Sequence, residues 1–323
     1  MSDPEPIDEL TDKLGIDDTD TRREARWELV DRGENAVEPL IEELEADDLK
    51  TKKDAAWVLG KVEDPRAIEP LVELFGDDSV SVRKKAARAL LKIGEEALPA
   101  MVEQARSGDP RRQKIALWFL PDFEDDSIGD VLFEALDSED PLVRRNAVRA
   151  MGLLDVDDAV DHLLDAIKDD DWRVRQWAAY SLGLISRKTG ATRALLRAVN
   201  DESVHVQYAA IVALGDNGRK SALSRLFTKL RGDDMILKVA AVKALGNIGS
   251  RKAVKPLIEL YESGDDYIRS EVVMALGRIG GAREIYDVLV DAAESEGVHD
   301  AAIHALGLLD TKRARKLIEK FDE

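Results

Sequence analysis

Side chains that commonly ligate metals or act as general bases are scarce in this 323-residue sequence. It has no cysteine, and its four histidines are His162, His205, His299 and His304. His299 and His304 lie about one helical turn apart, but the sequence around them has no recognised metal-ligand spacing. We therefore expect no metal site and interpret the histidines as ordinary surface or core residues.

Motifs that bind phosphate or activate a nucleophile are also missing. The sequence contains neither a glycine-rich phosphate loop nor a dinucleotide fingerprint, and it has no nucleophile elbow. No residue stands out as catalytic, and none as cofactor-binding. We therefore predict that the chain is not an enzyme and binds no cofactor.

The dominant feature is a repeated phrase. Val82–Leu90, Val174–Gly183, Leu237–Gly246 and Ile268–Gly277 share a Val-Arg or similar start and an Ala-Leu or Ser-Leu near the end, which Gly follows in the last three. We call the closing position the repeat glycine. It recurs every 29 to 32 residues, at Val30, Gly60, Leu91, Leu120, Gly152, Gly183, Gly215, Gly246, Gly277 and Gly307. A fixed period of this length predicts an array of about ten similar units.

Each unit has the pattern of a helical hairpin. Apolar residues at helical spacing form the first arm, and a second amphipathic stretch such as 67–75 follows a short polar break. Pro39, Pro70, Pro99 and Pro256 lie in the first turn of the second arm, where a missing N–H costs little. Aspartates in the following turn cap the next helix. Because one hairpin cannot bury its apolar stripe alone, neighbours must stack into an all-α solenoid.

The phrase Asp-Asp-x-x-x-Val-Arg-x-x-Ala-Ala-x-Ala-Leu-Gly-x-Ile, followed by Asp-Pro-Arg-Ala-Ile-x-Pro-Leu, resembles the HEAT-like repeat of the phycobilisome-lyase type. The resemblance covers about residues 17–321 and implies an α-α superhelix. It further implies that the Val-Arg helices line the concave face. Because the same repeat serves scaffolds, lyases, hydroxylases and glycosylases, it says little about function. The His-Glu pairs of the di-iron hydroxylases are absent here.

Two parts of the array depart from the pattern. Residues 1–16 form an acidic N-terminal segment or cap, and Glu28 and Arg32 occupy positions that are apolar in other units. In the fourth unit, bulky residues at 118–120 precede Pro121, which predicts a kink or looser stacking near residues 107–136 of the solenoid at 17–323. The position two before the repeat glycine is small in the third unit and in the last six units, which lets helices approach closely.

Basic residues eight positions before the repeat glycine are assigned to the scaffold. Each follows a turn carboxylate by five or six residues, as Arg83 follows Asp78 and Arg175 follows Asp170. The resemblance implies a ladder of charge-assisted hydrogen bonds between repeats rather than a phosphate site.

The positions seven, six and three before the repeat glycine are expected to project from the core onto the concave face. These thirty positions hold nine basic and four acidic residues, in a chain whose formal net charge is −19. Exposed aromatic residues beside cations are typical of binding surfaces. The candidate partner-binding residues are Trp27, Lys53, Trp57, Lys84, Lys85, Arg88, Lys114, Arg145, Arg149, Trp177, Tyr180 and Tyr208.

Two classes of partner fit such a groove. One is a protein or peptide, held as an acidic or amphipathic segment by a non-catalytic scaffold. The other is nucleic acid, by analogy with HEAT-fold alkylpurine DNA glycosylases, for which Asp54 with Trp27 and Trp57 would be the nearest site. A HEAT-type lyase or hydroxylase is a third and weaker alternative.

The charge balance favours the protein partner. With 66 acidic and 47 basic residues, the composition resembles the proteins of salt-loving archaea, although an ordinary acidic protein would look similar. At about 1 M salt the Debye length is about 3 Å, so phosphate contacts would be strongly screened. No apolar run is long enough for a membrane span, and the acidic N-terminus lacks a signal sequence. We therefore expect a cytoplasmic protein; its oligomeric state is left open.

Overall fold

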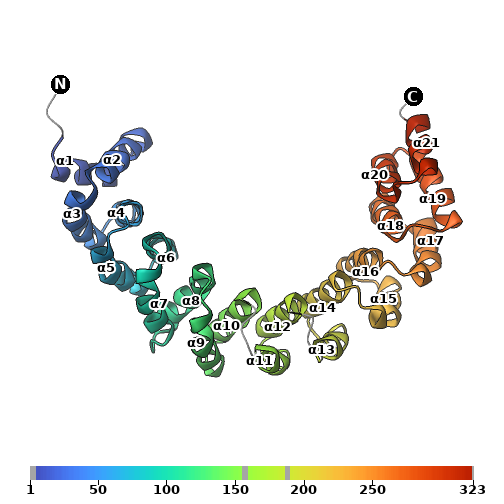
Figure 1. Ribbon diagram of the computed structural model, residues 1–323, viewed down its shortest axis with the longest axis horizontal. Coiled ribbons are helices and arrows are strands. Elements are labelled where there is room, and N and C mark those ends of the chain that lie inside the picture. The colour runs from blue at the N-terminus through green and yellow to red at the C-terminus, as the bar shows by residue number, and fades with distance from the viewer. Residues whose placement is uncertain (1–4, 155–158, 186–189, 322–323) are drawn as a thin grey trace. The chain divides into compact units, whose positions relative to one another are not determined.

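The computed structural model describes residues 5–154, 159–185 and 190–321, and this part of the chain is helical without any strand (Figure 1). It divides into two compact units, Met1–Val156 (unit 1) and Asp157–Glu323 (unit 2). Each unit is a row of helical hairpins, so the predicted all-α fold is confirmed. The single array predicted for residues 17–323 stays a prediction.

In unit 1 the phrase-bearing arms form one row of helices, which we call inner helices. They are α2 (Thr19–Arg32), α4 (Leu49–Val62), α6 (Val80–Ile93), α8 (Pro110–Phe119) and α10 (Pro141–Leu154). The second arms lie on the other side of the row (Figure 1). These outer helices are α1 (Ile7–Asp12), α3 (Val37–Glu42), α5 (Ile68–Glu73), α7 (Leu98–Ala105) and α9 (Gly129–Glu134).

Unit 2 repeats the arrangement. Its inner helices are α12 (Trp172–Leu184), α14 (Val204–Asp216), α16 (Met235–Ile248), α18 (Asp266–Ile279) and α20 (His299–Leu309). Its outer helices are α11 (Ala159–Ala166), α13 (Ala191–Ala198), α15 (Leu223–Leu230), α17 (Val254–Ser263), α19 (Arg283–Ala293) and α21 (Lys312–Phe321). The ten inner helices of the two units match the ten predicted repeats.

Aspartate caps begin most inner helices, as the sequence predicts. The Asp48 carboxylate accepts hydrogen bonds from the backbone N–H groups of Lys50 and Thr51, at 3.0 and 2.8 Å. Asp171 caps α12 and Asp234 caps α16 in the same way. Each cap satisfies amide groups that a helix start would otherwise leave without a partner.

Successive inner helices approach most closely at the repeat glycine. A Cβ atom added to Gly215 would lie 2.6 Å from both Cα and Cβ of Ala244, which is the small residue two before the next repeat glycine. Gly60 meets Ala89 in the same way, as Gly277 meets Ala305. The predicted role of the small residues in close packing is thus confirmed.

The fourth repeat lacks this contact. Half-buried Leu91 and exposed Trp118 stand where the α4–α6 pair has Gly60 and Ala89, and α6 contacts α8 far less than it contacts α4. Helix α8 ends at Phe119, and a 3₁₀ helix over Leu120–Phe123 contains Pro121. The predicted kink near residues 107–136 stays a prediction.

The N-terminal segment covers the first inner helix. Helix α1 and the 3₁₀ helix Lys13–Gly15 contact α2, and they bury Leu10 and Leu14. Arg32 of α2 bonds to the Glu28 carboxylate at 2.7 Å and to the backbone carbonyl of Glu5 at 2.8 Å. The two charged residues that depart from the repeat therefore pair with each other.

Replacing a repeat glycine should separate two helices. We expect Gly215→Ala to lower the free energy of unfolding by about 1–3 kcal/mol, because its methyl group would overlap Ala244. Gly307→Ala is the matched control, since no neighbouring atom lies within 4 Å of its added Cβ. This control should be neutral or gain up to about 1 kcal/mol from helix propensity. Thermal unfolding followed by circular dichroism would measure both, and equal shifts would contradict the packing argument.

Candidate functional site

The inner helices do not present all the predicted positions to solvent. Residues six before the repeat glycine include Asp54, Asn146, Ala209 and Ala240, and all four are buried. This position precedes the small Ala-type residue by four, so both lie on the flank that faces the preceding inner helix. The amide of Asn146, for example, donates a hydrogen bond of 2.9 Å to the backbone carbonyl of Lys114 on α8.

The other two positions also include buried residues. Leu117, three before the repeat glycine, and Val239, seven before it, lie in the core. The expectation that all thirty positions project from the core is therefore wrong, chiefly at the flank just described.

The ladder of basic residues links neighbouring repeats at several places. The Lys52 amino group lies 2.9 Å from the Asp77 carboxylate of the next turn. Arg175 is 7% exposed and bonds both carboxylate oxygens of Asp201, each at 2.9 Å. In the turn that precedes its helix, the basic residue donates to backbone carbonyls rather than to a carboxylate. Arg83, for example, donates to the carbonyls of Asp77 and Asp78. The assignment of these residues to the scaffold is confirmed there.

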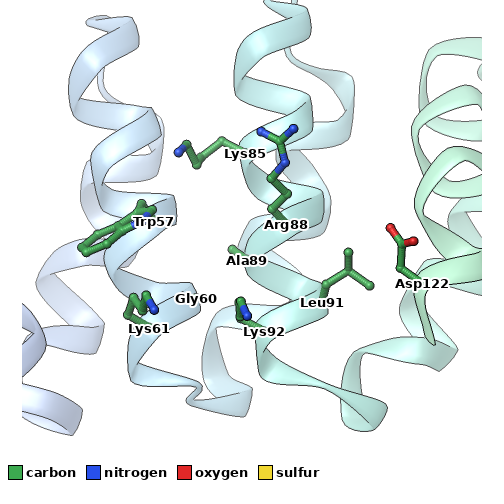
Figure 2. A pocket seen from close by; sticks show the side chains of 9 residues that line it. All are labelled: Trp57, Gly60, Lys61, Lys85, Arg88, Ala89, Leu91, Lys92 and Asp122. Atoms are coloured by element: carbon green, nitrogen blue, oxygen red, sulfur yellow. The ribbon is translucent and has the colours of Figure 1, made fainter. Parts of the chain in front are cut away.

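A pocket of about 480 Å³ opens on unit 1 between α4 and α6, and we call it the basic pocket (Figure 2). Its walls carry four cations and one carboxylate. The carboxylate comes from the 3₁₀ helix that follows α8. The lining residues are Trp57, Gly60, Lys61, Lys85, Arg88, Ala89, Leu91, Lys92 and Asp122. Lys85, Arg88 and Lys92 follow one another at helical spacing on α6 and therefore share one face of it.

The four cations of this pocket lack an ion-pair partner among the residues that the structure describes. Figure 2 shows Lys85 extending from α6 toward Trp57 on α4. Burial lowers the pKa of Lys85; the nearby charges of Arg88, Arg26 and Lys53 lower it further, while Asp54 opposes them. The pocket thus holds positive charge that its own side chains leave uncompensated.

Trp57 forms the aromatic wall of the pocket. Its ring meets that of Trp27 edge-on, with centroids 5.2 Å apart, and Trp27 itself stays 50% exposed. The guanidinium of Arg26 lies 5.1 Å from the Trp57 ring centre, and the Lys61 amino group lies 6.0 Å from it. These cation–π contacts hold the Trp57 ring between α2, which carries Arg26, and its own helix α4, which carries Lys61.

A second pocket lies beside the other flank of α6, and most of its cations have acceptors within the protein. Lys114 pairs with Asp140 at 2.8 Å, and Arg111 pairs with Asp78 at 3.2 Å. Arg145 donates to the Asn146 amide oxygen at 2.7 Å. Exposed Lys84 also lines this pocket, whose residues are Val80, Arg83, Lys84, Arg111, Lys114, Ile115, Trp118, Arg145 and Asn146.

The remaining candidates lie apart from these pockets. The Arg149 guanidinium lies over the Trp118 ring at 4.0 Å, and burial lowers its pKa. Lys53 is half-buried on α4. In unit 2, the rings of Trp177 and Tyr180 on α12 have centroids 5.8 Å apart, while exposed Tyr208 lies on α14. Burial raises the pKa of Tyr180, with a further contribution from Tyr208.

Sequence reasoning therefore brought together Trp57, Lys85 and Arg88, but it did not identify the whole basic pocket. Lys61 and Lys92 flank the predicted positions and complete the cation cluster. Asp122 could not be foreseen, because it belongs to the irregular fourth repeat. Leu91 in place of glycine and the bulky residues before Pro121 are the sequence signals that mark this place.

Asp54 is a structural carboxylate, which removes the nearest candidate for glycosylase chemistry. It is 8% exposed, and it accepts a hydrogen bond of 3.0 Å from Arg26 while lying 3.4 Å from the Arg22 guanidinium. Both arginines belong to the preceding inner helix, so Asp54 links α2 to α4.

The structure shows neither a metal site nor a membrane-spanning helix within the described residues. No group of three His, Cys, Asp or Glu side chains gathers there at ligand distance. Helices long and apolar enough to cross a bilayer are missing from the same part of the chain. His299 bonds through Nδ1 to the Ala293 carbonyl at 2.6 Å, and His205 stacks on Trp172 at 4.6 Å.

Comparison with protein families identifies the repeat. A model of HEAT repeats matches residues 37–120, 98–183, 129–214, 171–234 and 224–307, which together span most of the sequence. The chain belongs to the HEAT-repeat family. The resemblance to HEAT repeats drawn from the sequence is thus confirmed. A search of curated proteins finds no match.

Solved structures of low sequence identity share the fold. Importin β is 15% identical over 98% of this chain, with a TM-score of 0.65, and this chain spans 52% of importin β. Escherichia coli YibA is 16% identical, with 80% of this chain and 96% of YibA covered and a TM-score of 0.59. An engineered protein is 22% identical over 94% of this chain and 99% of its own length, with a TM-score of 0.50. The predicted α-α superhelix is confirmed.

Removing the Asp54 carboxylate should weaken unit 1. Asp54→Ala leaves Arg22 and Arg26 without their shared acceptor, and we expect a loss of about 2–4 kcal/mol in the free energy of unfolding. Glu24→Ala is the matched control, because Glu24 holds the same repeat position but is exposed on α2. Urea unfolding would measure both variants. A loss for Glu24→Ala as large as that for Asp54→Ala would contradict the assigned role.

Proposed function

We propose that this HEAT-repeat protein is a non-catalytic scaffold that binds a protein or peptide partner on the inner helices. The basic pocket is the observation that carries this proposal. Four cations gather there beside an aromatic wall, in a chain of net charge −19, and no described carboxylate pairs with them. Charge without an internal partner in a concave, partly apolar site is suited to an external ligand.

Aromatic residues support a macromolecular partner. Trp27 is half exposed beside the pocket, and unit 2 carries Trp177, Tyr180 and Tyr208 on its own inner helices. Tryptophan and tyrosine contribute a disproportionate share of binding energy at protein interfaces. Their packing energy also depends little on salt, unlike contacts between surface charges.

Nucleic acid is the weaker partner. The basic pocket groups its four unpaired cations closely, whereas a nucleic-acid backbone needs cations along its length. The cations of the second pocket are mostly paired already, and Asp54 is held by two arginines. A long polyanion would also meet the repulsion of the whole acidic chain.

Capture from a cell extract at high potassium chloride concentration tests the scaffold. We expect the full chain to retain one discrete protein after nuclease treatment. Trp57→Ala with Trp177→Ala should reduce the captured amount about tenfold or more, because both remove aromatic anchors. Tyr267→Ala is the control, since Tyr267 is 58% exposed on α18 and lines neither pocket. Equal capture by all three proteins, or capture that nuclease abolishes, would refute the proposal.

A further inference from the structure

The basic pocket has a charge imbalance that limits what can occupy it. Lys61, Lys85, Arg88 and Lys92 face one carboxylate, that of Asp122. Asp54, beneath the pocket, is already held by Arg22 and Arg26, so it does not neutralise the cluster. An occupant must therefore bring negative charge, and more than one unit of it.

The second pocket provides an internal comparison. Five basic residues line it, yet Lys114 and Arg111 pair with carboxylates of the protein and Arg83 donates to turn carbonyls. Its charge serves the stacking of the repeats. The four cations of the basic pocket have no such acceptors among the described residues. On one flank of α6 the cations therefore stabilise the stacked repeats, whereas on the other flank they are left for a ligand.

The position of the basic pocket along its helices favours carboxylates over phosphate. Gly60, Lys61, Leu91 and Lys92 lie in the last turns of α4 and α6, where the helix dipole is negative and no free backbone N–H is offered. Phosphate sites typically use helix N-termini, where N–H groups point at the anion. Singly charged carboxylates spread over several flexible cations fit this end of the helices better than one dianion.

The apolar part of the lining indicates a neighbouring apolar side chain. Trp57 and Leu91 lie at opposite ends of the lining, and Ala89 packs against Gly60 between them (Figure 2). A volume of about 480 Å³ holds a few side chains rather than a folded surface. A short peptide segment can supply both kinds of group at adjacent positions.

We infer that the basic pocket seats a short acidic segment of the partner, in which two or more Asp or Glu side chains flank one apolar side chain. The carboxylates pair with Lys85 and Arg88, and Lys61 and Lys92 close the rim. The apolar side chain packs on Trp57. This inference rests on the proposed scaffold function and names the chemistry of its partner.

Fluorescence anisotropy with a labelled peptide tests the pocket directly. The probe carries glutamates on both sides of one leucine, and a control peptide has glutamine in place of each glutamate. We expect saturable binding of the acidic probe to the full chain and at least about tenfold weaker binding of the glutamine peptide. Unlabelled phosphoserine peptide, inorganic phosphate and single-stranded DNA serve as competitors.

Matched charge variants locate the binding. Lys85→Gln with Arg88→Gln should weaken the acidic probe by about tenfold or more, since a charge pair is lost at each position. Lys61→Gln with Lys92→Gln changes exposed residues only and should weaken it as well. Lys252→Gln with Lys316→Gln removes two exposed cations from unit 2 and should leave the affinity unchanged. Circular dichroism verifies that each variant is folded.

Three results would overturn the inference. They are equal binding of the acidic and glutamine peptides, unchanged affinity in both pocket variants, and displacement of the probe by phosphate or DNA more effectively than by the unlabelled acidic peptide. None of these results would affect the capture experiment with Trp57→Ala and Trp177→Ala. The scaffold proposal can therefore survive even if the acidic-peptide inference fails.

Discussion

The close approach of successive inner helices is the constraint on which the rest of the structure depends. Gly60, Gly215, Gly246 and Gly277 each receive an alanine of the next repeat at distances that no side chain on the glycine could allow. This contact fixes how far apart the helices lie and how each is rotated about its axis. The rotation in turn decides which positions can reach a ligand. Several flank positions become buried links, such as Asp54 and Asn146, whereas half-buried Lys85 at the same position lines the basic pocket.

This constraint is relaxed between α6 and α8, beside the basic pocket. With Leu91 in place of glycine and Trp118 in place of alanine, α6 and α8 cannot approach as α4 and α6 do. Leu91 instead forms a pocket wall, and Asp122 reaches the same pocket from the 3₁₀ helix after α8. Helix α6 therefore packs closely against α4 and loosely against α8. The cations of α6 lie between these two kinds of packing.

Local pattern was enough to predict the hairpins, the aspartate caps and the small residues between helices, because each depends on residues close in sequence. The partners of individual charged residues were not predictable in this way. Lys114 pairs with Asp140 of the next turn, whereas Lys85 has no such acceptor, although both hold the same repeat position. That difference depends on which side chains the neighbouring repeats place opposite, and the repeat pattern does not contain this information. The division into two units likewise left no signal in the repeat period.

The floor of the basic pocket is Gly60 against Ala89, the same kind of contact that holds the helices together. Its walls are side chains that take no part in that contact. Substitutions in the walls could therefore change what the pocket recognises while the architecture persists, whereas the floor tolerates almost no variation. Recognition and architecture are in this sense encoded by separate residues of the same two helices, and related chains could diverge in ligand preference without rebuilding the repeat.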